Sequence, residues 1–232
     1  MLLDTKVYAM TWDPQWEKVF TSRAWGVYPP EELIRFTARH YYGTADRSAV
    51  RILELGCGPG PIVWYLAREG FTVSGIDGSP TAIAQARDRL IAEGLTADLR
   101  VGDFLELRSF YRPTYFDAIL DITSLQHNRY SAIERTIENA YQALRPGGRF
   151  FGLMLAEGSW GFGAGQEVEA GTFSGVEEGP LTGMGVTHFF TEAELRSLLA
   201  PFHDVSIDYS VRTLCSQSHW YKHWLVEARR PG

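Results

Sequence analysis

Three glycines at alternate positions follow a short apolar run, and an acidic residue stands two places before the first of them. The glycines are Gly56, Gly58 and Gly60, and the acid is Glu54. Glycine lets a chain bend tightly and lets a ligand approach the backbone where no Cβ intervenes. A nicotinamide-binding fingerprint would place its third glycine at the position of Pro61. The spacing therefore favours a nucleotide-like ligand other than a nicotinamide dinucleotide.

Two further acids follow at intervals that suit the same ligand. Asp77 ends an apolar strand pattern 17 positions after Gly60 (77 − 60), which leaves room for one helix and one strand. A carboxylate there could accept both hydrogen bonds of a ribose diol; the alternative is a simple helix cap. Asp103 follows the next strand pattern and is itself followed by Phe104, an apolar ring. Because strands of a parallel sheet end at one edge, these residues are expected to converge.

This pattern resembles the first motif of class I S-adenosylmethionine-dependent methyltransferases, Glu/Asp-x-Gly-x-Gly-x-Gly. The resemblance covers roughly residues 50–155 and includes the turn Pro146-Gly147-Gly148 before a fifth strand. It implies S-adenosylmethionine as cofactor and S-adenosylhomocysteine as product. It also implies that Asp103 accepts a hydrogen bond from the adenine amino group and that Phe104 packs on the ring. The cofactor-binding residues expected from it are Glu54, Gly56, Cys57, Gly58, Gly60, Asp77, Gly78, Asp103, Phe104 and Asp121.

The sequence gives fewer signals for the residues that bind the methyl acceptor. His127 follows the fourth strand pattern and is the candidate general base, since neutral imidazole can take a proton near pH 7; a cofactor contact or a structural hydrogen bond is the alternative. Trp25, Tyr28 and His188 are candidate substrate contacts, whereas Trp12 and Trp16 fit ordinary helix packing. No metal site is expected, although Asp117, Asp121 and Asn128 could be imagined as magnesium ligands.

Alternating strand and helix patterns must position these residues. They predict an α/β fold: one Rossmann-like, doubly wound, mostly parallel seven-stranded sheet with helices on both faces and an antiparallel C-terminal strand. The expected strands are 51–55, 71–76, 99–101, 116–122, 149–155, 204–211 and 220–228, and the helices of the core are 62–69, 79–92 and 131–144.

The chain is predicted to be a single methyltransferase domain, residues 1–232. Its expected parts are an N-terminal helical cap (1–49), a cofactor-binding core (50–156), a glycine-rich acceptor lid (157–187), and a C-terminal helix with a strand hairpin (188–232). The lid segment holds nine of the 23 glycines and five glutamates, without lysine or arginine. So long an irregular segment is usually functional or disordered, and its acidity disfavours polyanionic acceptors.

Composition limits the function classes. The 232 residues are 45% hydrophobic with a net charge of −6, which suits one core and disfavours nucleic acid as a partner. The sequence has neither a signal-peptide pattern nor a membrane-spanning run, and its two cysteines make no disulfide framework. We therefore expect a cytoplasmic protein without membrane partners, as monomer or homodimer.

The predicted function is methyl transfer to the oxygen or nitrogen of a small-molecule acceptor: a metabolite, sugar or natural product. Methylation of a protein or other macromolecule is the alternative, as is a non-catalytic S-adenosylmethionine-binding protein. A nicotinamide oxidoreductase is a more distant possibility.

Overall fold

A computed structural model describes residues 12–232, and the first part of the expected N-terminal cap lies outside them. The main sheet has seven strands in the order β3-β2-β1-β4-β5-β10-β9. β10 runs antiparallel to both β5 and β9, and the remaining pairs are parallel. The predicted fold class is confirmed. The strands are β1 (Arg51–Leu55), β2 (Thr72–Asp77), β3 (Asp98–Val101), β4 (Phe116–Ile122), β5 (Leu144–Leu155), β9 (His203–Leu214) and β10 (His219–Arg229).

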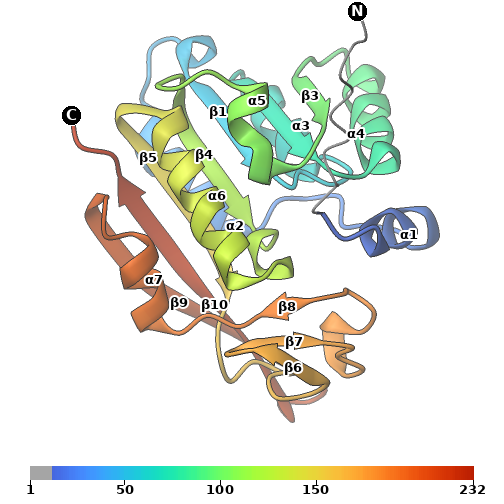
Figure 1. The fold of residues 1–232 in the computed structure, drawn as a ribbon. Helices are drawn as coiled ribbons and strands as arrows, with labels where there is room; N and C mark the ends of the chain where they lie inside the picture. The colour runs from blue at the N-terminus through green and yellow to red at the C-terminus, as the bar shows by residue number, and fades with distance from the viewer. Residues whose placement is uncertain (1–11) are drawn as a thin grey trace, which may run out of the picture.

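Helices cover both faces of this sheet (Figure 1). One buried apolar cluster joins the sheet to α5, α6 and α7, and a second joins its other face to α2, α3 and α4. A further helix, α1, packs on α4 at the edge of the core. The helices are α1 (Gln15–Ser22), α2 (Glu31–Tyr41), α3 (Pro61–Arg68), α4 (Pro80–Ala92), α5 (Leu107–Phe110), α6 (Tyr130–Ala143) and α7 (Glu192–Leu198).

Local sequence signals explain where several helices begin. Ser79 caps α4, because its hydroxyl accepts a hydrogen bond from the backbone N–H of Ala82 at 3.0 Å. Thr191 and Glu194 form a capping box at the start of α7. At the fifth strand the expectation was too short: β5 begins at Leu144, ahead of the Pro-Gly-Gly turn, and its pairing with β4 shifts register there.

The segment 157–187 is not irregular throughout, contrary to expectation. It contains β6 (Gln166–Glu169), β7 (Thr172–Ser174) and the first residue of β8 (Thr187–His188), which form a separate three-stranded sheet. Buried Phe173, Val176 and Leu181 anchor this sheet against Leu155 and Phe189. The apolar residues between the glycines therefore give the segment a small core of its own.

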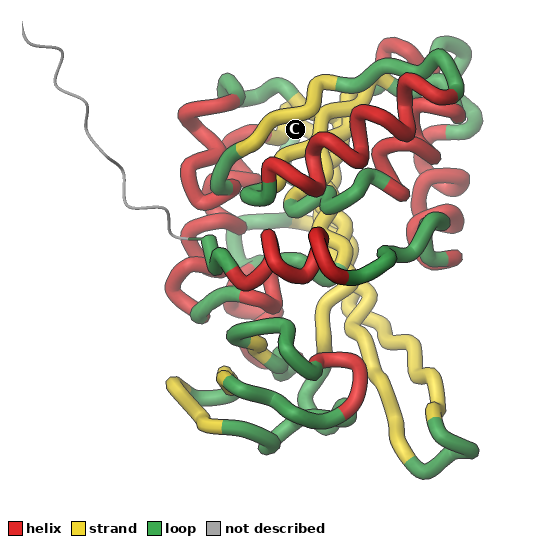
Figure 2. Tube along the Cα trace, turned by 90° about the vertical axis from the view of Figure 1, so that its right-hand side faces the viewer, coloured by secondary structure: helices red, strands yellow, loops and turns green. Residues whose placement is uncertain are grey.

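β9 and β10 form a long hairpin that extends past the body of the main sheet (Figure 2). β9 is the edge strand of the sheet. Both cysteines are free, Cys57 buried and Cys215 exposed near the tip of the hairpin. Among the helices of residues 12–232, none is long and apolar enough to cross a bilayer.

Candidate active site

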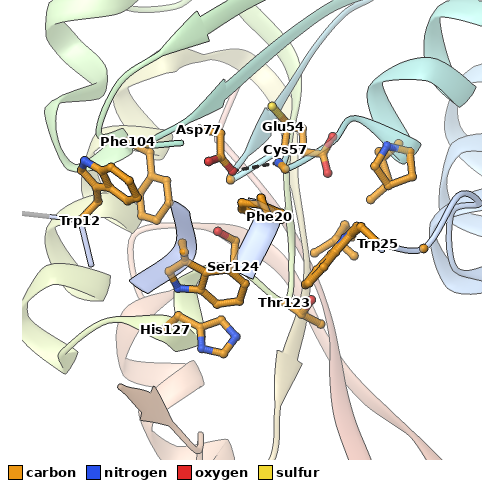
Figure 3. Close-up of a pocket in the computed structure, with 18 of the residues that line it drawn as sticks. Trp12, Phe20, Trp25, Glu54, Cys57, Asp77, Phe104, Thr123, Ser124 and His127 are labelled. Atoms are coloured by element: carbon orange, nitrogen blue, oxygen red, sulfur yellow. Dashed lines mark hydrogen bonds between the residues drawn. The ribbon is translucent and has the colours of Figure 1, made fainter. Parts of the chain in front are cut away.

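A pocket of about 940 Å³, including its open mouth, lies beyond the carboxyl ends of β1, β2 and β4. The strand order reverses between β1 and β4, and ligands of open α/β sheets bind at such a reversal. Figure 3 shows Glu54 and Asp77 on one side of the pocket and Thr123, Ser124 and His127 on the opposite side. The lining residues are Trp12, Asp13, Trp16, Phe20, Trp25, Gly26, Tyr28, Pro30, Glu54, Gly56, Cys57, Gly58, Pro61, Ile62, Asp77, Gly78, Phe104, Ile122, Thr123, Ser124, His127 and Asn128.

The glycine bend after β1 forms one wall, and its three glycines serve different ends. Gly56 and Gly58 line the pocket in the left-handed region, at φ 62° and 51°. A side chain on Gly56 would overlap the hydroxyl of Ser124. Gly60 lies outside the lining residues; a Cβ there would approach Cβ of Ala86 in α4 to 2.7 Å. The third glycine therefore lets α3 and α4 pack closely, while the first two shape the pocket.

Asp77 ties this bend to the start of α4. One carboxylate oxygen accepts from the backbone N–H of Gly58 at 2.8 Å (Figure 3). The other accepts from the backbone N–H of Ser79 at 2.8 Å. Burial raises the pKa of Asp77, partly offset by these two hydrogen bonds. Each carboxylate oxygen has a second lone pair, so Asp77 can still accept from a ligand in the pocket.

Glu54 has a buried carboxyl oxygen, Oε2, without a hydrogen-bond partner. Its side chain is only 3% exposed and lies beside the bend. Burial, and then the nearby charge of Asp77, raise the pKa of Glu54 well above its usual range. An orphaned carboxyl group in a pocket is costly unless a donor or cation meets it. The ammonium group of S-adenosylmethionine has the required charge and donors, so this side of the pocket fits that cofactor.

Phe104 lines the pocket, but Asp103 does not. The Asp103 carboxylate caps a short helical turn, accepting from the backbone N–H of Leu105 at 2.9 Å. On the same side, the ring of Trp12 occupies the space that a side chain on Gly78 would need. Trp12 and Phe104 thus offer flat apolar surfaces where a nucleobase was expected (Figure 3).

Asp121 was expected to contact the cofactor and is not among the lining residues. It is fully buried, and its Oδ1 accepts from the backbone N–H groups of Ser124 and Leu125, at 3.1 and 2.9 Å. Burial raises the pKa of Asp121 to about 7. The carboxyl group thereby fixes the turn that carries Thr123 and Ser124 into the pocket. Neither Thr123 nor Ser124 was among the predicted cofactor or substrate contacts.

His127 reaches the pocket wall, as predicted. Its Nδ1 lies 3.2 Å from the carbonyl oxygen of Val186, a contact in which Nδ1–H donates. Nε2 then carries the lone pair and lies 3.4 Å from the amide nitrogen of Gln126. The protein that encloses the ring lowers the pKa of His127 to about 4, so the imidazole is neutral at physiological pH.

The aromatic residues of the N-terminal cap divide differently from the prediction. Trp25 and Tyr28 line the pocket as expected, but so do Trp12 and Trp16, which were assigned to helix packing. The ring of Trp16 packs edge-on to that of His127, with centroids 4.6 Å apart. Trp16 lies in α1 and Trp12 precedes it. What the sequence does not show is that α1 lies across the pocket.

Contacts at both ends hold α1 there. Glu17 accepts from the hydroxyls of Ser79 and Thr81 at the start of α4. The side chains of Gln15 and Arg23 each donate to backbone carbonyls in the segment 182–183. α1 therefore joins the cofactor side of the molecule to the small sheet.

Two parts of the chain that were expected to contact the acceptor, His188 and the segment 157–187, do not line the pocket. His188 is fully buried in β8; its Nδ1 lies 2.7 Å from the hydroxyl of Thr172, and its ring packs against Phe190. The segment 157–187 contributes none of the lining residues; it supports His127 from behind through Val186 and holds α1 through residues 182–183. The imagined magnesium ligands do not converge either, because Asp117 pairs with Arg145 at 2.6 Å near the other end of β4.

Comparison with known proteins finds similarities over part of this chain. Residues 52–148 match the family model described as a methyltransferase domain. Over 104 residues the chain is 35% identical to a ubiquinone biosynthesis O-methyltransferase of Xylella fastidiosa, covering 45% of this chain and 41% of that protein. Over 135 residues it is 31% identical to the S-adenosyl-L-methionine-dependent Diels-Alderase iccD of Talaromyces variabilis, covering 56% and 45%. The chain thus spans less than half the length of either relative.

The fold also matches solved structures. An S-adenosylmethionine-dependent methyltransferase of Methanosarcina mazei superposes with a TM-score of 0.60 at 24% identity, over 78% of this chain and 92% of that one.

Proposed function

We propose that this chain is a class I S-adenosylmethionine-dependent methyltransferase and that it transfers a methyl group to a small-molecule acceptor. The observation that carries the proposal is the unpartnered carboxyl oxygen of Glu54 beside the glycine bend. It lies in the same pocket as Asp77 and Phe104. Glu54 would bind the ammonium group of the cofactor, Asp77 its ribose, and Phe104 with Trp12 its base.

When bound, S-adenosylmethionine supplies a methyl group already activated by a positively charged sulfur. The chain then has to orient the acceptor and keep water away. The rings of Trp16, Phe20 and Trp25 limit water on one side of the pocket. The hydroxyls of Thr123 and Ser124 can orient a polar acceptor group on the other side.

His127 is proposed to hold the acceptor rather than to act as a strong base. With Nδ1–H donated to Val186, Nε2 carries the lone pair, and an acceptor hydroxyl can take the place of its long 3.4 Å contact with the Gln126 amide nitrogen. Its pKa of about 4 keeps it neutral but makes it a weak proton acceptor. His127→Gln, which keeps a polar group, should raise KM more than it lowers kcat. A fall of kcat by about a thousandfold would indicate general-base catalysis instead.

A second candidate is ring closure by an enzyme that binds the cofactor without consuming it. The similarity to a Diels-Alderase favours it, together with the aromatic walls of the pocket. The two candidates differ in one readout. Methyl transfer requires S-adenosylmethionine and releases S-adenosylhomocysteine, whereas ring closure needs no methyl group and proceeds with either.

The test of the proposed function begins with isothermal titration of S-adenosylmethionine, S-adenosylhomocysteine and NAD. We expect the first two to bind and NAD to fail. A screen of small-molecule and protein acceptors with labelled methyl donor follows. Glu54→Gln should weaken binding of the cofactor, while Glu138→Gln, in α6 outside the pocket, should not. Absence of binding at millimolar concentration would overturn the proposal.

A further inference from the structure

We infer that the acceptor half of the pocket takes an uncharged, flat aromatic or conjugated molecule that bears a hydroxyl group, and that it rejects carboxylates and phosphates. The inference rests on the proposed function and specifies the substrate class of that same site. Three observations carry it: the aromatic wall, the charges of the lining residues, and the polar turn after β4.

The aromatic wall is built by three rings that fix one another. Trp25 meets Trp16 edge-on at 6.0 Å between centroids, and meets Phe20 in the same way at 5.2 Å. Trp16 and Phe20 are 5.6 Å apart. All three line the pocket, and Trp16 and Trp25 are only half-buried, so part of each ring is free to contact a ligand. Rigid aromatic surfaces favour flat apolar ligands, because offset and edge-on ring contacts add to the gain from burial.

The charged side chains that line the pocket are all acidic. The carboxyl and imidazole side chains that line the pocket in the described part of the chain are those of Asp13, Glu54, Asp77 and His127, and no lining residue is lysine or arginine. Burial lowers the pKa of His127 to about 4, so it brings no positive charge at neutral pH. An acceptor carboxylate or phosphate would lose its hydration here without gaining a protein cation.

An amine acceptor is also disfavoured. A protonated amine has no lone pair with which to take a methyl group. In addition, the cofactor brings its own sulfonium charge into the same cleft, and two positive charges at close range repel each other. An uncharged nucleophile avoids both problems.

The polar turn supplies the hydrogen bonds for one hydroxyl. Thr123 has φ 60°, a conformation that is rare for a β-branched residue. The turn is held by the two bonds to Asp121 and by the bond from the Thr123 N–H to the carbonyl of Leu153, at 2.9 Å. Backbone strain of this kind persists where surrounding structure enforces it, often at ligand sites. Here it brings Thr123, Ser124 and His127 to the face opposite the cofactor residues (Figure 3).

Three probes of one shape test the inference: 2-naphthol, 2-naphthoate and 2-naphthylmethylamine, which at pH 7.5 are neutral, anionic and cationic. Equilibrium dialysis measures each with and without saturating S-adenosylhomocysteine. We expect naphthol to bind at least about tenfold more tightly than naphthoate, a difference of about 1.4 kcal/mol. The amine is expected to lose affinity when S-adenosylmethionine, with its sulfonium charge, replaces S-adenosylhomocysteine. Equal or tighter binding of naphthoate, or no binding of naphthol under either condition, would overturn the inference.

Variants locate the binding. Trp16→Ala and Trp25→Ala should each weaken naphthol several-fold, whereas Trp220→Ala, on the exposed hairpin, should not. Asn128→Lys adds a cation to the wall and should raise naphthoate affinity over that of the parent. An unchanged naphthol affinity in both pocket variants, or an unchanged naphthoate affinity in Asn128→Lys, would count against this site.

The two proposals fail separately. If S-adenosylhomocysteine binds but naphthol does not, the substrate class is wrong and the proposed function stands. If naphthol binds and S-adenosylhomocysteine does not, the pocket is apolar as inferred but the proposed methyl transfer fails.

Discussion

Gly56 and Ser124 come from different strand ends and pack so closely that a Cβ on Gly56 would overlap the Ser124 hydroxyl. Gly56 belongs to the bend after β1, and Ser124 to the turn after β4. Asp77 fixes the first of these segments and Asp121 the second. The two walls of the pocket are thus in direct contact at its floor, and a change on either side should be felt on the other.

Gly56→Ala should therefore damage both stability and cofactor binding. The added methyl group meets Ser124, and the backbone is at φ 62°, where alanine is strained. Overpacking of this kind costs about 1–3 kcal/mol. Urea unfolding and titration with S-adenosylhomocysteine measure the two effects. Gly43→Ala is the control, since a Cβ there meets nothing within 4 Å. The double variant with Ser124→Gly should recover part of the loss; no recovery would show that the backbone conformation alone is responsible.

Asp77→Asn tests the hydrogen bonds that hold the glycine bend after β1. An amide presents only one acceptor atom, so it cannot hold the N–H groups of both Gly58 and Ser79 as the carboxylate does. Loss of a hydrogen bond to a charged group costs about 1.5–3 kcal/mol, which corresponds to roughly a ten- to hundredfold weaker Kd for S-adenosylhomocysteine. Asp98→Asn, on the exposed side of β3, should leave the Kd unchanged. A variant that binds as tightly as the parent would remove Asp77 from the cofactor site.

Glu17→Ala should loosen α1 and speed release of the cofactor. The Glu17 carboxylate binds the start of α4, where the helix dipole also favours a negative charge. Without it, α1 keeps the hydrogen bond from Gln85 of α4 and the hydrogen bonds to the carbonyls of residues 182–183. Stopped-flow tryptophan fluorescence should show faster dissociation of S-adenosylhomocysteine, and trypsin should cleave at Lys18 sooner. Thr21→Ala, an exposed change on the same helix, is the control. Equal rates in both variants would mean that α1 is not held by this contact.

The sequence was sufficient to predict the α/β core and the positions of Glu54, Gly56 and Asp77, because these depend on local spacing. Strand, bend and helix follow one another within a short stretch, and parallel strands end at one edge. Two acids illustrate where such reasoning stops. Asp77 and Asp121 both end strands, yet one lines the pocket and the other is buried behind a turn. That difference depends on the turn after β4. In this turn Thr123 has a left-handed backbone conformation, which no residue pattern predicts.

The role of α1 was missed for a similar reason. Its aromatic spacing predicts an apolar face, but not the surface on which that face lies. Its docking depends on Glu17 meeting Ser79 across 62 residues of sequence. In 157–187 the many glycines concealed a short apolar core, because its members Phe173, Val176 and Leu181 have no regular spacing.

Asp121→Asn should change stability in a pH-dependent way. The pKa of Asp121 is about 7 in the folded protein, against an ordinary 3.8, because the carboxyl group is buried. Between these values the folded state binds more protons than the unfolded state, so the parent protein loses stability as pH rises. Each unit of pKa difference corresponds to about 1.4 kcal/mol. Asparagine does not titrate, and its carbonyl oxygen can still accept from Ser124 and Leu125.

The variant should therefore gain stability relative to the parent between pH 4 and pH 7, and the difference should level off above pH 7. Urea unfolding at pH 5, 6, 7 and 8 measures the difference in free energy of unfolding, with Asp208→Asn, an exposed change on β9, as the control. His127 titrates in the opposite sense, since its pKa is lowered to about 4, but it is present in both proteins and cancels in the comparison. A difference that stays constant with pH would mean that Asp121 is ionised throughout, and that the two backbone N–H groups outweigh its burial.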